Sequence, residues 1–267
     1  WVVSMRSITS KFWGAEIYSG QNRFGRYQSH GSLDVLYDGS LAANGYPTNN
    51  AVGGWDWNVV PGTTTVHYTS WLDMMPAQST TQRFDQYSKE KNFSGALAMD
   101  SNGIFATDFS QIDKWGNTEC YLPTNLEFKK SMFAFGDMII CMGSDITSSG
   151  MYSDDMVTAT NLFQNIVTDY VGDLVVNGEM AIQGESRIIG DNDNWFITPA
   201  GTGYFVPKGN DPIVLTYGEQ TTPSQTGADY VSPTGTAMAA KAYIDHGVKP
   251  TGAKDIFVVI PSVTVPK

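Results

Sequence analysis

The sequence predicts an all-β fold, a large antiparallel β-sandwich, and three observations carry this prediction. Short segments rich in β-branched and aromatic residues alternate with turn residues along most of the chain, which contains 27 glycines and 12 prolines. The sequence shows no repeat of fixed period, no heptads and no long amphipathic helix. Between residues 172 and 217 the segments follow one another at the short, regular spacing that is typical of sandwiches.

The expected strands can be placed in order. Residues 1–12 alternate apolar and polar side chains like a half-buried strand, and Asn102-Gly103 is the best short hairpin signal, between 93–99 and 104–109. The other expected strands are 32–37, 63–68, 126–135, 138–146, 158–167, 172–176, 186–189, 195–198, 203–207, 213–217, 237–244 and 256–260. The longer connections are expected to be loops at 42–54, 69–92, 110–125, 147–157 and 218–236.

A second hairpin is predicted around Gly136-Asp137. Its second strand contains the run MIICMG, so we expect both faces of that strand to be covered and Cys141 to be a buried thiol. Two cysteines are too few for a disulfide framework, although the sequence leaves a bridge between Cys120 and Cys141 open.

Length and composition indicate one large unit, residues 1–267, without a convincing internal boundary. A hydrophobic content of 41% can fill a sizeable core. The net charge of −11 repels polyanions, so no nucleic-acid partner is expected, and a sulfated ligand would need local cations or cations from elsewhere. No apolar run approaches membrane-spanning length, and no membrane partner is expected. The start, WVVSMRSIT, lacks an initiator Met and a signal-peptide pattern, so we expect a strand from within a larger protein.

The stretch FWGAEIYSGQNRFGRYQSHG, residues 12–31, is the strongest candidate for a ligand site. It combines Glu16, Arg23, Arg26 and His30 with five aromatic residues and four glycines. Arginine forks clamp carboxylates or sulfates, and glycines let a backbone approach a ligand closely. The alternative is a solvated hairpin whose charges pair with one another.

This stretch, as W-x-x-E-I-Y-x-x-x-N-R-F-G-R-Y-Q-S-H-G, resembles the start of the large β-sandwich domain of polysaccharide lyase family 8, which includes chondroitin and hyaluronan lyases. Further pieces stand in the same order as in that family. They are GWDWN at 54–58 with PGTTT at 61–65, NFSG at 92–95, KKS at 129–131, GSDI at 143–146 and YIDH at 243–246. The resemblance covers most of the chain.

The resemblance implies a super-sandwich domain of the galactose-mutarotase-like type, cut from a larger enzyme. It implies β-elimination on uronic-acid glycans, with chondroitin or dermatan sulfate first and hyaluronan second, by a secreted or periplasmic lyase. In the family, an α/α-toroid domain that precedes the sandwich supplies a catalytic His, Tyr and Arg, and a small β-domain follows. Glu16 matches the glutamate that orients this arginine and histidine, so the resemblance assigns it an orienting role and a pKa below about 4.3. The expected partners are an acidic polysaccharide and the toroid domain, and the isolated chain is expected to be inactive.

Alternatives to this function stay open on the residues alone. The rival from another class is a non-catalytic carbohydrate-binding or scaffold sandwich, and Glu16 could instead form a surface salt bridge. Arg23 and Arg26 are candidates for substrate contact at a cleft rim, although on a regular strand they would face opposite sides. Trp55 and Trp57 would share one face and could stack on sugar rings, but buried core is the stronger interpretation.

Metal and nucleophile sites are not indicated. His30, His67 and His246 lack the spacing and partners of a metal or nucleophile site, so we interpret each as structural. The run Asp191–Asn194 offers oxygen ligands, but it lacks the Gly and distal Glu of a calcium loop and is better explained as a turn. We therefore expect no cofactor, with a structural calcium ion left open.

Overall fold

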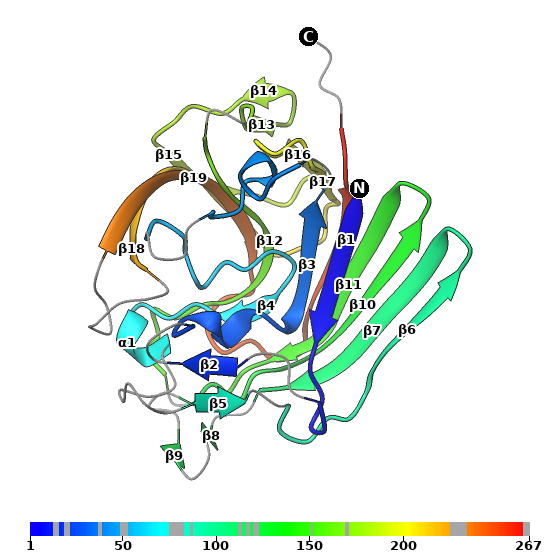
Figure 1. Ribbon diagram of the computed structural model, residues 1–267, viewed down its shortest axis with the longest axis vertical. Coiled ribbons are helices and arrows are strands. Elements are labelled where there is room, and N and C mark those ends of the chain that lie inside the picture. Colours follow the sequence, from blue (N-terminus) through cyan, green and yellow to red (C-terminus); the bar gives the residue numbers. More distant parts are fainter. Residues whose placement is uncertain are drawn as a thin grey trace.

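Two antiparallel sheets dominate the computed structural model (Figure 1). The structure describes residues 1–12, 16–18, 22–36, 39–48, 53–74, 83–85, 88–111, 114–115, 118–119, 123–150, 152–168, 171–224 and 234–263, with the backbone alone at 16–18, 83–85, 114–115 and 118–119. The predicted all-β fold is confirmed. Within the described residues, no helix has the length and apolarity to cross a bilayer.

The larger sheet has nine strands in the order β14-β13-β16-β17-β20-β11-β10-β7-β6. Its neighbouring strands all pair antiparallel. The strands are β6 (Ser94–Met99), β7 (Asn102–Ser110), β10 (Glu127–Phe135), β11 (Met138–Thr147), β13 (Val175–Val176), β14 (Glu179–Met180), β16 (Asn194–Ile197), β17 (Gly203–Val206) and β20 (Ala253–Ile260).

The second sheet has five strands in the order β15-β18-β19-β12-β4. They are β4 (Thr64–Val66), β12 (Thr158–Ile166), β15 (Glu185–Ile189), β18 (Ile213–Pro223) and β19 (Thr234–Asp245). Three small two-stranded sheets join β1 (Val2–Ser7) with β3 (His30–Leu36), β2 (Glu16–Tyr18) with β5 (Arg83–Asp85), and β8 (Lys114–Trp115) with β9 (Thr118–Glu119). The short helical turns are η1 (Gly25–Tyr27), η2 (Ala42–Asn44) and α1 (Trp71–Met74).

The main core lies between the two large sheets. The nine-stranded sheet contributes Phe196, Tyr204 and Val259, and the five-stranded sheet contributes Phe163 and Leu215, all at most 5% exposed. β3 adds Leu33 and Val35 to the same cluster. This burial of alternate residues on facing sheets is the physical basis of a sandwich.

Several local predictions need correction. The first hairpin turns at Asp100-Ser101, because Met99 pairs with Asn102, and Asp100 takes the positive φ of 53° that the turn needs. The second hairpin turns at Gly136-Asp137 as predicted. In β11 only one face is covered: Cys141 is a fully buried free thiol, whereas Met142 is 44% exposed. Cys120 lies outside the described residues.

The tract 218–236 is also not a simple loop. β18 continues to Pro223 and pairs with β19 residue by residue as far as Thr234. Threonine is favoured in strands, and a proline at a strand end has no ladder hydrogen bond to lose. The expected loop 69–92 contains α1 and β5.

Candidate functional site

The segment 12–31 places β2 at one end of the sandwich, beside η1 (Figure 1). The backbone of β2 pairs antiparallel with β5, so that Glu16 stands opposite Asp85 and Tyr18 opposite Arg83. The side chain of Glu16 lies outside the described part of the structure. Its orienting role and its lowered pKa therefore remain predictions.

Arg23 and Arg26 lie beside and within a 3-10 turn rather than on a regular strand, so the strand geometry that would place them on opposite faces does not apply. Both side chains are buried, at 0% and 1% exposed. Arg23 Nε donates to the carbonyl of Ser224 at 3.1 Å, and the Arg26 guanidinium lies 5.0 Å from the centre of the Tyr68 ring. Buried arginines held in this way anchor the turn to the interior. Their contact with substrate stays a prediction.

An aromatic cluster underlies the turn. Phe24 stacks on Trp57 with ring centres 5.8 Å apart, and Trp57 Nε1 donates to the carbonyl of Pro223 at 2.9 Å. The Tyr27 hydroxyl donates to the carbonyl of Val66 in β4. The turn is thereby tied to both β4 and the end of β18, and through them to the five-stranded sheet.

Trp55 and Trp57 are 5% and 6% exposed, as the buried-core interpretation expects. Trp55 stacks on Tyr46, with ring centres 6.1 Å apart, whereas Trp57 stacks on Phe24. It also lines a pocket of about 210 Å3, whose other lining residues are Pro47, Thr48, Gly53, Ile166, Thr236 and Ala237. A role in sugar stacking is untested and stays a prediction.

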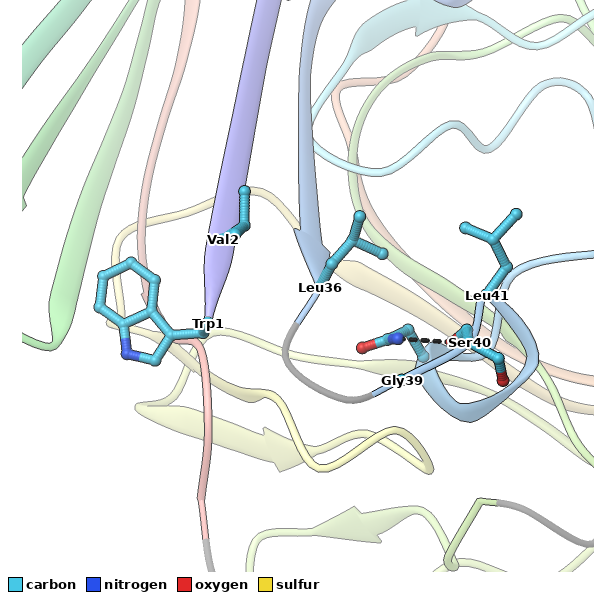
Figure 2. A pocket seen from close by; sticks show the side chains of 7 residues that line it. Trp1, Val2, Leu36, Gly39, Ser40 and Leu41 are labelled. Atoms are coloured by element: carbon cyan, nitrogen blue, oxygen red, sulfur yellow. Dashed lines mark hydrogen bonds between the residues drawn. The ribbon is translucent and has the colours of Figure 1, made fainter.

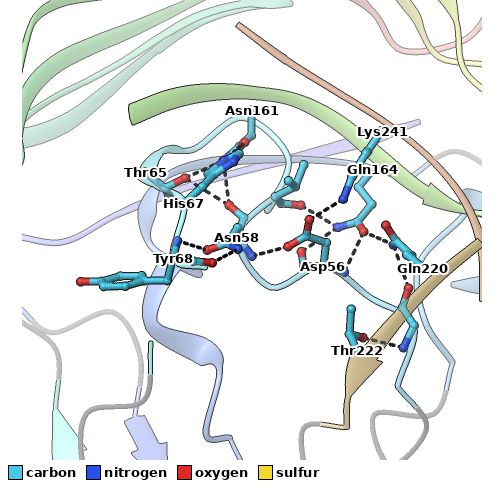
Figure 3. Close-up of polar contacts among 12 residues, drawn as sticks. Asp56, Asn58, Thr65, His67, Tyr68, Asn161, Gln164, Gln220, Thr222 and Lys241 are labelled. Atoms are coloured by element: carbon cyan, nitrogen blue, oxygen red, sulfur yellow. Dashed lines mark hydrogen bonds and ion pairs between the residues drawn. The ribbon is translucent and has the colours of Figure 1, made fainter. Parts of the chain in front are cut away.

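A buried polar network holds the loop that carries both tryptophans (Figure 3). Asn161 of β12 donates to the Asn58 carbonyl at 3.1 Å and to the Thr65 hydroxyl at 2.8 Å, and its Oδ1 lies 2.9 Å from His67 Nε2. Burial lowers the pKa of His67, so its imidazole is neutral near pH 7. These bonds satisfy an irregular backbone that the sheet ladders do not reach.

The second half of the network joins the same loop to β18 and β19. Gln164 Oε1 accepts from the Asp56 backbone at 2.9 Å and from Gln220 Nε2 at 2.7 Å. The Lys241 ammonium lies 2.5 Å from the Asp56 carboxylate. Burial opposes ionisation of Asp56, but Lys241 and the other donors around it hold its pKa below the ordinary value.

Sequence reasoning missed a second buried charged cluster, between the two large sheets. Lys130 and Asp255 are 2% and 5% exposed, and Lys130 donates to the carbonyl of Gly62. The Thr160 hydroxyl donates to Asp255 at 2.7 Å, and His246 Nδ1 lies 2.7 Å from the Asp211 carboxylate. Burial lowers the pKa of Lys130 to about 8. The sequence offered one signal for the burial of Lys130: it alternates with Phe128 and Met132, so the three side chains point to the same, inner face of β10.

The remaining polar predictions fall in turns and in the interior. His30 begins β3, where its ring lies 4.5 Å from that of Phe109, and burial lowers its pKa to about 3. The predicted turn at 191–194 is confirmed: Asp191 and Asp193 accept from the backbone of Gly209 and Lys208, at 2.5 and 2.9 Å. Among the described residues, no group of three or more His, Cys, Asp or Glu side chains could hold a metal ion.

A further pocket, of about 320 Å3, lies at the end of β1 away from segment 12–31 (Figure 2). Trp1 and Leu41 line it and are 52% and 51% exposed, and two further lining residues are joined by a 2.7 Å hydrogen bond that Asn44 donates to the Ser40 carbonyl. No site residue was predicted there.

Known proteins resemble the whole of this chain. Residues 1–267 match the model of "Polysaccharide lyase family 8, super-sandwich domain". The chain is 29% identical to the chondroitin sulfate ABC endolyase of Proteus vulgaris and 31% identical to the chondroitin sulfate ABC exolyase of Bacteroides thetaiotaomicron, over 100% and 98% of its own length. It spans only 24% of the length of each of these relatives.

Solved structures agree on the fold. A chondroitinase AC lyase, solved in complexes with oligosaccharides, matches 99% of this chain with a TM-score of 0.73 at 20% identity, over 34% of its own chain. A Paenibacillus xanthan lyase matches 98% of it with a TM-score of 0.72 at 20% identity, over 23% of its own chain. The whole-length family match and the shared fold together show that this chain belongs to polysaccharide lyase family 8, as its super-sandwich domain.

Proposed function

We propose that this chain works as the super-sandwich domain of a glycosaminoglycan lyase. Chondroitin or dermatan sulfate is the first proposed substrate and hyaluronan the second. One observation carries the proposal: the chondroitin sulfate ABC lyases of two bacteria are 28–31% identical to the chain over 94–100% of its length. A hyaluronate lyase that is 29% identical over 54% of the chain supports the second substrate.

The proposed reaction is β-elimination at a uronic acid. The C5 proton leaves to a base, the bond from C4 to the bridging oxygen breaks, and a C4–C5 double bond forms as the oxygen takes up a proton. Groups that neutralise the uronate carboxylate make the C5 proton more acidic. Glu16 contributes as a positioning residue, by orienting an arginine and a histidine that another domain of the polypeptide supplies.

The local structure supports a fixed position for the backbone of Glu16. β2 pairs with β5 and contacts η1, which is bound to the interior by Arg23, Arg26 and Tyr27. Catalytic arrangements depend on such rigid support, because small displacements of a catalytic group lower the rate strongly.

The charge of the chain supports a separate origin, in another domain, for substrate-binding cations and the base. The chain carries a net charge of −11, and both arginines of segment 12–31 are buried. A sulfated polymer is repelled by such a domain at long range. We therefore propose that the rest of the polypeptide supplies further cations that hold the substrate, together with the base.

The test is the ultraviolet absorbance of the unsaturated uronate product. The full-length polypeptide should give a steady rise with chondroitin sulfate and dermatan sulfate and a slower one with hyaluronan, whereas the 267-residue chain alone should give none. Binding of chondroitin sulfate by the full-length polypeptide without product would support the scaffold alternative. Product formation by the chain alone would contradict the placement of the base.

A further inference from the structure

The nine-stranded sheet is apolar on both of its faces. On the inner face, Phe196, Tyr204, Val259 and Ile139 are cross-strand neighbours and are at most 5% exposed. The residues that alternate with them point outward. In Figure 1, β1 and β3 lie on the inner side of this sheet, and β6, β7, β10 and β11 form an outer wall of the molecule.

A continuous row of apolar side chains crosses the outer face. Directly opposed residues in an antiparallel ladder share one face. Seven such residues on seven successive strands are paired in sequence: Trp195, Phe205, Val258, Ile140, Phe133, Ile104 and Leu97. None of the seven is fully buried, and Trp195, Phe205, Ile104 and Leu97 are 39%, 38%, 39% and 57% exposed. We call these seven residues the outer row.

Adjacent positions extend this apolar surface on both sides of the outer row. Met142 and Ile256 form a cross-strand pair on the same face and are 44% and 37% exposed, and Phe135 is 48% exposed. Charged residues gather instead at one end of the face, where Lys129 stands opposite Asp108. The largest exposed patch of an ordinary soluble monomer is a few hundred Å2, so an apolar band across seven strands indicates an interaction surface.

Two features of this face suit a partner that packs closely. A hollow of about 360 Å3 lies beside the outer row, toward the charged end of the face, and its lining includes Ala106 and Met142 as well as Asp108 and Lys129. The edge strand β6, with the sequence SGALAM, carries no charged residue or proline, although exposed edges are commonly protected in that way. This edge strand therefore lacks the charges and prolines that commonly keep a free sheet edge from associating.

We propose that the outer row is the docking surface for another domain of the same polypeptide, one that presents a complementary apolar surface. This inference rests on the proposed function, in which the chain is one domain of a larger lyase. In the curated relatives the region that matches this chain is 24% of the polypeptide, which leaves three quarters to form neighbouring domains. A covalently joined domain has a high effective concentration at this surface, so it can cover the surface permanently. Permanent interfaces are more apolar than transient ones, as is this face with its few charges.

Thiol labelling of the full-length polypeptide tests this proposal. Ile104→Cys and Ile256→Cys place a thiol on the docking face, and Ile188→Cys is the matched control, since Ile188 is 74% exposed on β15 of the other sheet. A maleimide probe is applied to the native protein at a high and a low protein concentration, and the reaction of the parent protein, whose Cys141 is buried, is subtracted. Labelling in urea confirms that all three introduced thiols are equally reactive once unfolded.

We expect the two docking-face thiols to react at least about tenfold more slowly than the control, because a covered site reacts only when the domains open transiently. Equal rates for all three variants would overturn the proposal. Protection that disappears when the protein is diluted from dimer to monomer would also overturn it, because a second copy would then be the occupant. The readout does not depend on catalysis, so a polypeptide without lyase activity but with protected thiols would refute the proposed function alone.

Discussion

Replacing Lys241 by methionine removes the cation from a largely buried ion pair while it keeps most of the side-chain volume. The Lys241 and Asp56 side chains are 16% and 15% exposed. Removing one partner of a fully buried pair costs about 3–5 kcal/mol, because the other charge is left without compensation. Both side chains keep some solvent access, and Asp56 retains a 3.0 Å bond from the Asn58 backbone. We therefore expect a loss of about 2–3 kcal/mol in the free energy of unfolding.

The pH dependence makes this prediction specific. In the parent protein the pKa of Asp56 is lowered, so the pair stabilises the fold above the ordinary aspartate pKa and loses that effect as pH falls through the lowered value. Without Lys241, burial raises the pKa of Asp56, and a proton taken up in mild acid relieves the penalty. Urea unfolding should therefore show a larger loss at about pH 7 than at about pH 5.

Two further variants serve as controls, one for an exposed ion pair and one for lost packing. Lys129→Met removes the 2.8 Å pair with Asp145, whose side chains are 56% and 65% exposed, and we expect no measurable shift of the urea midpoint. Lys241→Met combined with Asp56→Asn should recover part of the stability, because no uncompensated charge remains. A loss that is equal at both pH values and unchanged by Asp56→Asn would refute the electrostatic reasoning and leave packing as the cause.

Three further predictions concern the support of the candidate site. Phe24→Ala should cost about 3–5 kcal/mol in urea unfolding, because Phe24 is fully buried, whereas Phe12→Ala at a 75% exposed position should change little. Gly62→Ala should lower the melting temperature much more than Gly209→Ala. Both glycines have positive φ, at 77° and 92°, but only at Gly62 would an added Cβ lie 2.5 Å from the backbone of β3. Burial opposes protonation of His246, but the neighbouring carboxylates raise its pKa. The protonated imidazole should therefore stabilise the fold below about pH 6.5, and this stabilisation should be lost as pH rises through the raised pKa. His246→Gln should flatten this dependence of the free energy of unfolding on pH.

The sequence supported the sandwich because periodicity and turn chemistry are local signals. The hairpin at Gly136-Asp137 follows directly from such signals. The first hairpin was displaced by two residues, because Asp100 can take the left-handed conformation without glycine. The run MIICMG was interpreted as covered on both faces, yet Met138 and Met142 are exposed and Ile140 is only partly buried on its outer face. Sequence alone does not show whether an apolar face is covered within the same chain.

The candidate site was less predictable because it depends on contacts between distant segments. Burial of Arg23 depends on a carbonyl at Ser224, and the tryptophan loop depends on Asn161 and Lys241. Two cations near aromatic residues are typical of a ligand site, but the same residues can anchor a turn in the interior. The sequence offered a signal for buried charge at Lys130 on β10 and at Asp255 on β20, because each alternates with buried apolar residues of its strand.

The turnover of Glu16→Gln in the full-length polypeptide, followed by the absorbance of the unsaturated uronate, tests most directly whether this domain contributes to catalysis. The substitution keeps the shape of the side chain and removes the charge proposed to orient an arginine and a histidine. We expect kcat to fall by about 10²-fold or more with little change in melting temperature, while Glu179→Gln, at an exposed position in β14, leaves kcat unchanged. A Glu16→Gln enzyme that turns over like the parent would contradict the account and leave Glu16 as a surface salt-bridge residue.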